Sequence, residues 1–172
     1  MTTAICPGSY DPVTFGHVDV ITRAAAIFDR VVVGVVRQPQ HKRGTLLSVE
    51  ERVEFLREAL ADAPNVEVDV FSELVVEFAR RWGARTMVKG LRVISDFEWE
   101  LQMNHLNRTL APEIETVYVM ARPQYSFVSS SGVKEIASFG GKVEEFVPES
   151  VARRLRELYG AAHEGTPVSP HE

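Results

Sequence analysis

Short apolar segments rich in Val and Ile alternate with amphipathic helical patterns over most of this chain. Nearly continuous apolar segments are typical of parallel strands that are buried on both faces of a sheet. The segments predict strands at Ala4–Cys6, Val31–Val36, Val66–Phe71, Thr86–Val88 and Thr116–Met120. Helices are predicted at 17–28, 49–61, 73–82, 96–110, 131–139 and 149–159.

Repeating strand–helix units predict a single-domain, doubly wound (Rossmann-like) α/β fold. We expect a five-stranded parallel sheet, helices on both of its faces and a C-terminal helical extension. Two Ser-x-x-Glu patterns, Ser48 to Glu51 and Ser95 to Glu98, predict capping boxes at helix starts. In such folds ligands bind beyond the carboxyl ends of the strands, so the residues that follow each strand are the candidates for a site.

Length and composition fit one domain at residues 1–160 and a disordered tail at 161–172, where Gly and Pro recur without an apolar period. A net charge of -5 argues against broad nucleic-acid binding. No apolar run approaches the roughly 20 residues that span a bilayer, and no signal-peptide pattern is present. The single cysteine, Cys6, excludes an internal disulfide, and no zinc-type spacing occurs. We therefore expect a cytoplasmic protein without membrane or nucleic-acid partners.

The segment Gly8–His17, GSYDPVTFGH, lies between the first predicted strand and the first predicted helix. A glycine-containing turn lets the backbone approach a phosphate, and a helix N-terminus offers unpaired N–H groups with a favourable dipole. His17 falls in the first helical turn, where its imidazole can donate to the same phosphate. Taken alone, the segment equally fits a tight turn that carries a surface histidine.

Three further segments also follow predicted strands. The first is a basic loop, Pro39–Gly44, which contains Lys42 and Arg43. The second, KGLR at 89–92, places two cations around a glycine that allows close backbone approach, and SDFEWE follows at 95–100. The third is YSFVSSS at 125–131, whose serine hydroxyls can either cap a helix or bind a phosphate.

The second half of the first motif, Thr14 to His17, resembles the (T/S)xGH-type signature of the nucleotidyltransferase superfamily. Its wider context, PGSYDPVTFGHVDVITRAAAIFD, resembles the phosphopantetheine adenylyltransferases in particular. KGLR with DFEWE, and YSFVSSS, are similar to two further motifs of that family, and the three matches span residues 5 to 136 in order. The resemblance implies transfer of AMP from ATP to 4'-phosphopantetheine, which gives dephospho-coenzyme A and pyrophosphate in coenzyme A synthesis.

The resemblance also implies roles for particular residues. The catalytic residues are expected to be His17, Lys42 and Arg92. The expected ATP-binding residues are Ser9, Tyr10, His17, Gly90, Leu91, Arg92, Glu100, Tyr125, Ser126, Phe127, Val128, Ser129, Ser130 and Ser131. The expected substrate-binding residues are Ser9, Lys42, Val75 and Lys89. We expect magnesium to arrive with ATP rather than on residues of the chain, a homohexamer, and feedback by coenzyme A as an open question.

Three positions depart from the family pattern. The loop that carries Lys42 is about two residues longer than expected, which leaves Arg43 as an alternate. Lys89 stands where many members have arginine, so it keeps the charge and loses the bidentate geometry. Gly132 replaces a larger residue such as leucine and weakens the helix start by roughly 0.5–1 kcal/mol if it lies in the first turn.

Two alternatives to this function remain at the level of sequence. One is nucleotidyl transfer to another phosphorylated acceptor, such as adenylyl transfer to nicotinamide mononucleotide or cytidylyl transfer to a polyol phosphate. The other is a non-catalytic nucleotide sensor on the same scaffold, which needs a phosphate cradle but no aligned second anion site.

Overall fold

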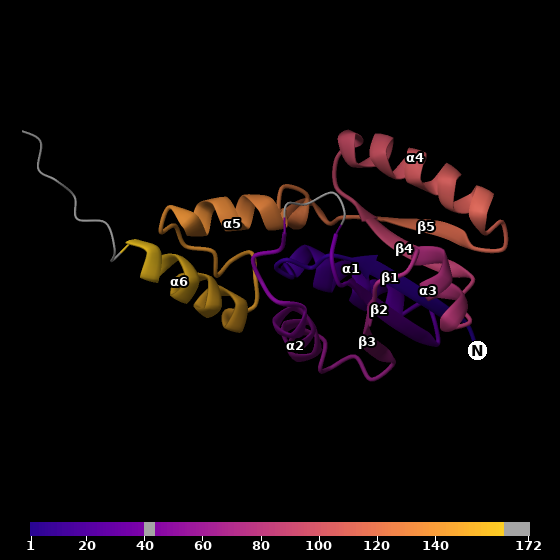
Figure 1. The fold of residues 1–172 in the computed structure, drawn as a ribbon, viewed down its shortest axis with the longest axis horizontal. Helices are drawn as coiled ribbons and strands as arrows, with labels where there is room; N and C mark the ends of the chain where they lie inside the picture. Colours follow the sequence, from indigo (N-terminus) through magenta and orange to yellow (C-terminus); the bar gives the residue numbers. More distant parts are fainter. Residues whose placement is uncertain (40–43, 164–172) are drawn as a thin grey trace, which may run out of the picture.

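The computed structural model describes residues 1–39 and 44–163 of the chain (Figure 1). Five strands form one parallel sheet with the order β3-β2-β1-β4-β5. They are β1 (Thr3–Gly8), β2 (Arg30–Val36), β3 (Val66–Phe71), β4 (Thr86–Leu91) and β5 (Glu115–Met120). This order, which grows outward from β1 in both directions, confirms the predicted doubly wound sheet.

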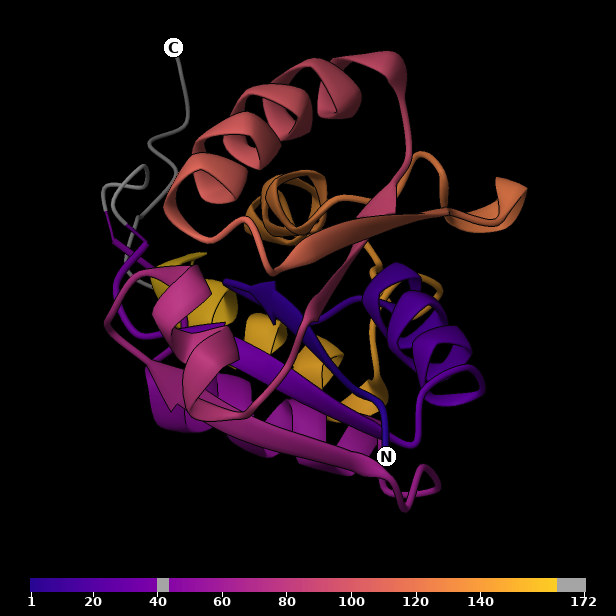
Figure 2. The ribbon, with the colours of Figure 1, turned by 90° about the vertical axis from the view of Figure 1, so that its right-hand side faces the viewer.

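The helices follow the strands in alternation and then continue past the sheet (Figures 1 and 2). They are α1 (Phe15–Ala25), α2 (Val49–Ala59), α3 (Val75–Arg81), α4 (Ile94–Leu110), the 3-10 turn η1 (Pro123–Tyr125), α5 (Ser130–Ser138) and α6 (Glu149–His163). The last two helices are the predicted C-terminal extension. The tail predicted at 161–172 lies mostly outside the described residues. No helix in the described ranges is long and apolar enough to cross a membrane.

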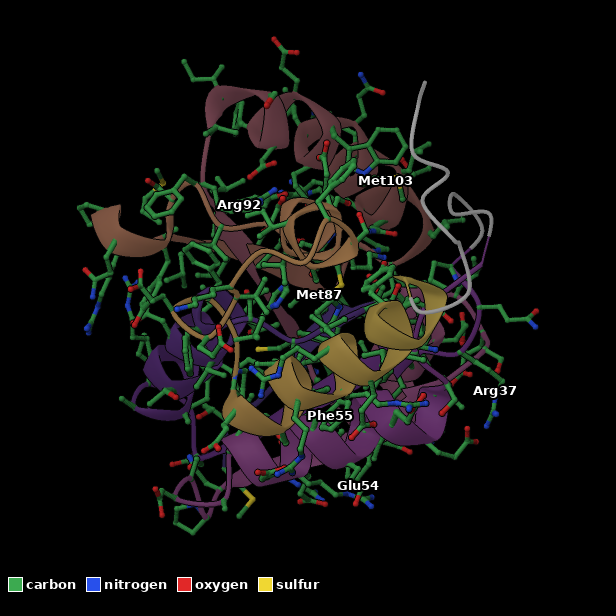
Figure 3. The ribbon with its side chains drawn as sticks, turned by 90° about the vertical axis from the view of Figure 1, so that its left-hand side faces the viewer. Arg37, Glu54, Phe55, Met87, Arg92 and Met103 are labelled. Carbon is green, nitrogen blue, oxygen red and sulfur yellow. The ribbon has the colours of Figure 1, made fainter. Side chains whose placement is uncertain are left out.

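Alternate residues of the central strands enter two separate cores, one on each face of the sheet. In β2, Val31, Val33 and Val35 belong to the larger core, whereas Val32 belongs to the smaller one. Residues of α1, α2, α5 and α6 complete the larger core, and α3 contributes to the smaller. Figure 3 views the first of these faces, where α6 lies beside α2. Burial on both faces explains why the strand segments read as nearly continuous apolar runs.

Gly34 in the middle of β2 is required by close packing. A Cβ at this position would lie 2.5 Å from Cε1 of Phe78 and 3.2 Å from Cε1 of Phe71. These two rings stack with centroids 4.7 Å apart in the smaller core. The glycine therefore lets two aromatic rings cover the strand directly.

Two helix starts were predicted from capping boxes, with different outcomes. At α2 the box is present: Ser48 Oγ accepts from the Glu51 N–H at 3.1 Å, and the Glu51 carboxylate accepts from the Ser48 N–H at 2.8 Å. The box at Ser95 was wrong, because α4 begins at Ile94 after an N-cap residue whose side chain makes no capping bond. In this turn the carboxylate of Asp96 instead accepts a hydrogen bond from the Arg92 backbone N–H.

Candidate active site

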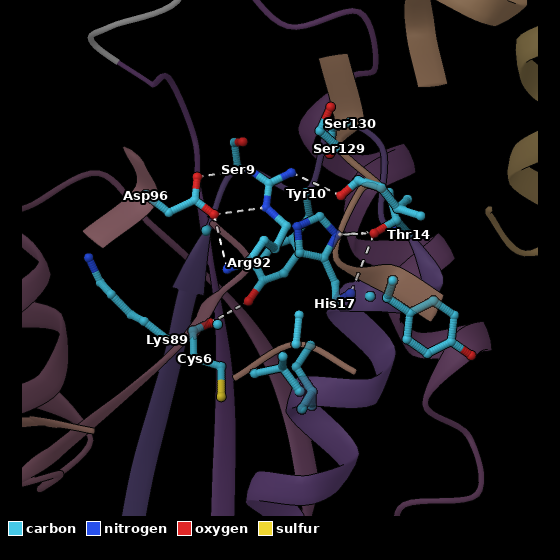
Figure 4. Close-up of a pocket in the computed structure, with 18 of the residues that line it drawn as sticks. Cys6, Ser9, Tyr10, Thr14, His17, Lys89, Arg92, Asp96, Ser129 and Ser130 are labelled. Atoms are coloured by element: carbon cyan, nitrogen blue, oxygen red, sulfur yellow. Dashed lines mark hydrogen bonds and ion pairs between the residues drawn. The ribbon is translucent and has the colours of Figure 1, made fainter. Parts of the chain in front are cut away.

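A cavity of about 470 Å³ opens at the carboxyl ends of β1 and β4 (Figure 4). Its walls come from three stretches that are distant in sequence, within residues 6–21, 88–100 and 121–131. The predicted site residues that line it are Ser9, Tyr10, His17, Lys89, Gly90, Arg92, Glu100, Tyr125, Val128, Ser129, Ser130 and Ser131. The fold thus brings the three sequence motifs to one place.

The remaining predicted residues lie elsewhere. The Leu91 side chain is buried, and Val75 on α3 packs against the smaller core. Phe127 is 70% exposed and meets the edge of Phe146 instead of the cavity. Ser126 Oγ donates to the Pro123 carbonyl at 2.9 Å. Lys42 and its alternate Arg43 lie outside the described residues.

The turn before α1 is held by Tyr10. Its φ of 49° is in the left-handed region, and its buried hydroxyl donates to the Cys6 carbonyl at 2.8 Å. A Cβ at Gly8 would lie 2.9 Å from the Tyr10 ring, so the glycine makes room for this ring under the turn. The ring also meets His17 edge-on, with centroids 5.1 Å apart. Tyr10 therefore supports the wall from which His17 projects.

His17 is oriented by the N-cap of its own helix. The Thr14 N–H donates to His17 Nδ1 at 3.0 Å, and Thr14 Oγ1 accepts from the His17 N–H at 3.4 Å. A backbone N–H can only donate, so Nδ1 is the acceptor and the proton of the neutral ring lies on Nε2. This capping box, with histidine in place of Glu or Gln, was missed from the sequence. It turns the imidazole into an oriented donor at the cavity (Figure 4).

Arg92 is the most firmly held cation at the cavity. Its guanidinium donates to both carboxylate oxygens of Asp96, at 3.0 and 3.1 Å, and to the Val128 carbonyl at 2.9 Å. Two of its five N–H groups are not used in these contacts. Asp96 was not predicted as a site residue, although its position four residues after Arg92 on a helix start was the available signal. The carboxylate sets the direction of the guanidinium.

Lys89 and Glu100 form an ion pair at the cavity, with Nζ and Oε2 2.6 Å apart. Both side chains are about four-fifths buried, at 19% and 20% exposure. The sequence predicted the two residues as ligands of different substrates and did not predict their contact. The pairing offsets the negative charge of Glu100 in a cavity expected to receive anions.

The serine run is divided between structural and cavity positions. Ser129 is the N-cap of α5 and accepts from the Gly132 N–H at 3.0 Å. Ser130 Oγ donates to the Pro12 carbonyl at 2.8 Å, and Ser131 is exposed where it lines the cavity. Gly132 lies in the first turn of α5, the position at which a glycine is expected to weaken the start of the helix. The amino end of α5 therefore faces the cavity, where first-turn N–H groups favour an anion.

A buried cation, Arg52, joins the loops behind the cavity and was missed from the sequence. Its side chain is 1% exposed and donates to the carbonyls of Ser9, Val36 and Arg37 at 2.8–2.9 Å, and to that of Ser48 at 3.3 Å. Burial lowers the pKa of Arg52, although a guanidinium remains charged at any physiological pH. In the sequence, the only indication that Arg52 is buried is its position on the apolar face of the helical pattern that became α2.

Within residues 1–39 and 44–163, no group of three or more His, Cys, Asp or Glu side chains could hold a metal ion. The cavity offers cations, hydroxyls, the His17 imidazole and backbone N–H groups, and its two carboxylates, Asp96 and Glu100, are each paired with a cation. This composition fits the binding of anionic groups, phosphates above all.

Known proteins resemble this chain over most of its length. The family described as cytidylyltransferase-like matches residues 5–136, which contain all three motifs. Fold and site together define the class as nucleotidyltransferase. A protein of Caldanaerobacter subterraneus subsp. tengcongensis is 50% identical over 159 residues, which cover 92% of this chain and 98% of that protein. One of Desulforudis audaxviator is 50% identical over 165 residues, covering 96% and 100%.

A protein of Deinococcus radiodurans is 48% identical over 161 residues, which cover 94% of this chain and 96% of that protein. All three relatives are named phosphopantetheine adenylyltransferase. The chain belongs to the cytidylyltransferase-like family and, within it, to the phosphopantetheine adenylyltransferases.

Proposed function

We propose that this enzyme transfers the adenylyl group of ATP to 4'-phosphopantetheine, giving dephospho-coenzyme A and pyrophosphate in coenzyme A biosynthesis. The names of its relatives support the reaction. The observation that carries the assignment is the convergence of His17, Lys89, Arg92 and the serine run on one cavity. Such a set of fixed donors is what two repelling phosphate groups need.

In the proposed step, an ionised phosphate oxygen of 4'-phosphopantetheine attacks the α-phosphorus of ATP. A new P–O bond forms as the bond to the β-phosphate oxygen breaks, and the electron pair leaves with pyrophosphate. The nucleophile is already an anion at neutral pH, so the chain needs no general base. Its task is to align the two substrates and to stabilise the charge on the transferring phosphoryl group.

Each cavity residue has a proposed part in this alignment. His17, as an oriented Nε2–H donor, stabilises the α-phosphoryl oxygens. Arg92 and the amino end of α5 hold the β- and γ-phosphates, while Lys89 and Ser9 meet the attacking phosphate. Lys42 has the same proposed role as Lys89. Magnesium enters with ATP as part of the substrate, since the described residues provide no metal cage.

The reaction is tested by measuring pyrophosphate release with ATP and 4'-phosphopantetheine. Parallel reactions use nicotinamide mononucleotide with ATP and a polyol phosphate with CTP, and mass spectrometry identifies each product. We expect efficient release only with the first pair, with dephospho-coenzyme A as product. Faster turnover of another acceptor overturns the substrate assignment. Tight ATP binding without any pyrophosphate release overturns the enzymatic one.

We also propose that the chain assembles into a homohexamer. Large apolar side chains of α4 are exposed, among them Ile94 at 81%, Trp99 at 50% and Leu106 at 59%, and Met120 at the end of β5 is 62% exposed. Exposed apolar surface of this extent commonly marks an interface. Light scattering should give six times the 19.2 kDa chain mass, and Leu106→Glu should lower it. A monomeric wild type contradicts the proposal.

We further propose that the enzyme is cytoplasmic and that coenzyme A inhibits it by feedback. Coenzyme A contains the reaction product, so it should compete for the same cavity. Titration of coenzyme A into the pyrophosphate assay should raise the KM for 4'-phosphopantetheine. No inhibition at saturating coenzyme A contradicts the feedback.

A further inference from the structure

Asp11 is a fully buried carboxylate in the turn that leads to His17. Its oxygens accept from the Leu46 N–H at 3.1 Å, from the Leu47 N–H at 2.9 Å and from Lys134 Nζ at 2.8 Å. A buried charge is costly unless it is paired and hydrogen-bonded, so these partners are necessary for Asp11 to be there. Asp11 itself does not line the cavity.

The carboxylate of Asp11 is ionised at neutral pH. Burial opposes its charge, but hydrogen bonds from Lys134, Leu47 and Leu46 outweigh this and hold its pKa below the usual range. Buried Arg52 on α2 adds a favourable interaction with the same charge. Tyr159 on α6 is also affected by this charge, because burial and, to a smaller extent, the negative charge of Asp11 raise the pKa of its phenol. The charge is therefore embedded between several elements, with Lys134 as its direct cation.

Lys134 and Ser130 join α5 to the same short stretch of the turn. Ser130 Oγ donates to the Pro12 carbonyl, and Lys134 Nζ pairs with the adjacent Asp11, both at 2.8 Å. The two helical residues are four apart and so lie on one face of α5. Two residues beyond Pro12, Thr14 caps α1 and orients the imidazole ring. A short, continuous set of contacts thus links the amino end of α5 to His17.

We propose that Asp11 and Lys134 form a positioning pair, which fixes the amino end of α5 relative to His17. This inference rests on the proposed function, in which that helix end holds the leaving pyrophosphate and the imidazole contacts the transferring phosphoryl group. In-line transfer requires both ends of the triphosphate in register, and a misplacement of about 1 Å can cost about 10²-fold in rate. The pair touches no substrate and acts through the two elements that do.

The test substitutes Lys134 and compares rates with affinities. Lys134→Met keeps the aliphatic stem and removes the cation, Lys134→Arg restores a cation, and Lys142→Met is the matched control on an exposed lysine. We expect kcat to fall about tenfold to 10²-fold in Lys134→Met, with the KM for 4'-phosphopantetheine within about twofold of wild type. Lys134→Arg should recover most of the rate, and Lys142→Met should match wild type.

Lys134→Met leaves a buried charge without its cation, so a second variant guards against loss of the fold. Asp11→Asn combined with Lys134→Met removes both charges, and we expect the same fall in kcat from the folded double variant. A folded variant with wild-type kcat overturns the pair. So does a loss that Lys134→Arg fails to restore, or one that only follows the unfolded fraction in a melting curve.

A binding measurement separates this inference from the proposed function. Calorimetry gives the Kd of each variant for ATP with no second substrate present. We expect about three- to tenfold weaker binding in Lys134→Met, because the two ends of the triphosphate no longer meet aligned groups. If wild type binds ATP but transfers nothing to 4'-phosphopantetheine, the proposed reaction fails while this comparison still tests the pair. An unchanged Kd then overturns the positioning role.

Discussion

The imidazole of His17 has a structural role and a proposed catalytic role, and different substitutions remove them separately. Nδ1 closes the capping box of α1 by accepting from the Thr14 N–H. In the proposed reaction, Nε2–H is the donor to the transferring phosphoryl group. Glutamine at the third helical position can accept the same N–H, as in the ordinary capping box. His17→Gln therefore keeps the cap and loses the imidazole, whereas His17→Ala loses both.

Loss of each role has its own expected effect, on thermal stability for the cap and on kcat for the donor. Loss of a helix cap costs typically about 1 kcal/mol, which in a domain of this size lowers Tm by about 2–4 °C. Loss of one preorganised donor to the transition state costs about 10²–10³ in kcat. We expect His17→Ala to show both effects. In His17→Gln the Tm should stay near wild type while kcat falls at least about tenfold, the side-chain amide being a displaced donor.

The two readouts are pyrophosphate release at saturating substrates and scanning calorimetry of the same preparations. Circular dichroism controls for the helical content of both variants. Wild-type turnover in either variant would falsify the donor role of the imidazole. Equal Tm values for the alanine and glutamine variants would instead refute the capping role.

Three further predictions concern buried charges and the thiol. Arg52→Met should lower the free energy of unfolding in urea by roughly 1.5–3 kcal/mol, because partly buried carbonyl oxygens lose their charged donor; a change below about 0.5 kcal/mol contradicts this. The lowered pKa of Asp11 stabilises the folded state above its unfolded pKa of about 4, and this contribution is lost as the pH falls through the folded pKa. Asp11→Asn should therefore flatten the acid limb of a stability–pH curve, and parallel curves would argue against the assignment. Burial raises the pKa of Cys6 to about 12, so iodoacetamide should label it only in denaturant; labelling of the native protein at mildly alkaline pH would contradict that burial.

Features that depend on nearby residues were predictable from the sequence. The five strands were predicted within a few residues, because apolar runs of β-branched residues reveal burial on both faces. The capping box at Ser48 was predicted for the same local reason, since both partners lie within one helical turn. The box at Ser95 satisfied the same pattern and failed. The carboxylate of Asp96, the next residue, accepts hydrogen bonds from the backbone and side chain of Arg92, and α4 already begins at Ile94, before Ser95.

Features that depend on distant partners were not predictable. Asp11 and Arg52 read as ordinary charged residues, yet both are buried. The partners of Asp11 lie 35 to 123 residues away, and two of them are backbone N–H groups that carry no sequence signal. The Lys89–Glu100 pair was likewise missed, because strand and helix had to be packed before the two charges could meet.

The order of residues along the chain was enough to determine the class of fold and the sheet edge that carries the candidate site. Both follow from periodicity and from residue types that lie close together, which act before any long-range contact forms. The chemistry expected at that edge came from the resemblance of three motifs to a known family. Only the folded chain decided which serine of the run at 129–131 caps α5, which ring nitrogen of His17 carries the proton, and which charges are buried. Most buried polar groups of a folded protein have a hydrogen-bond partner, and long-range packing determines which distant partners are within reach.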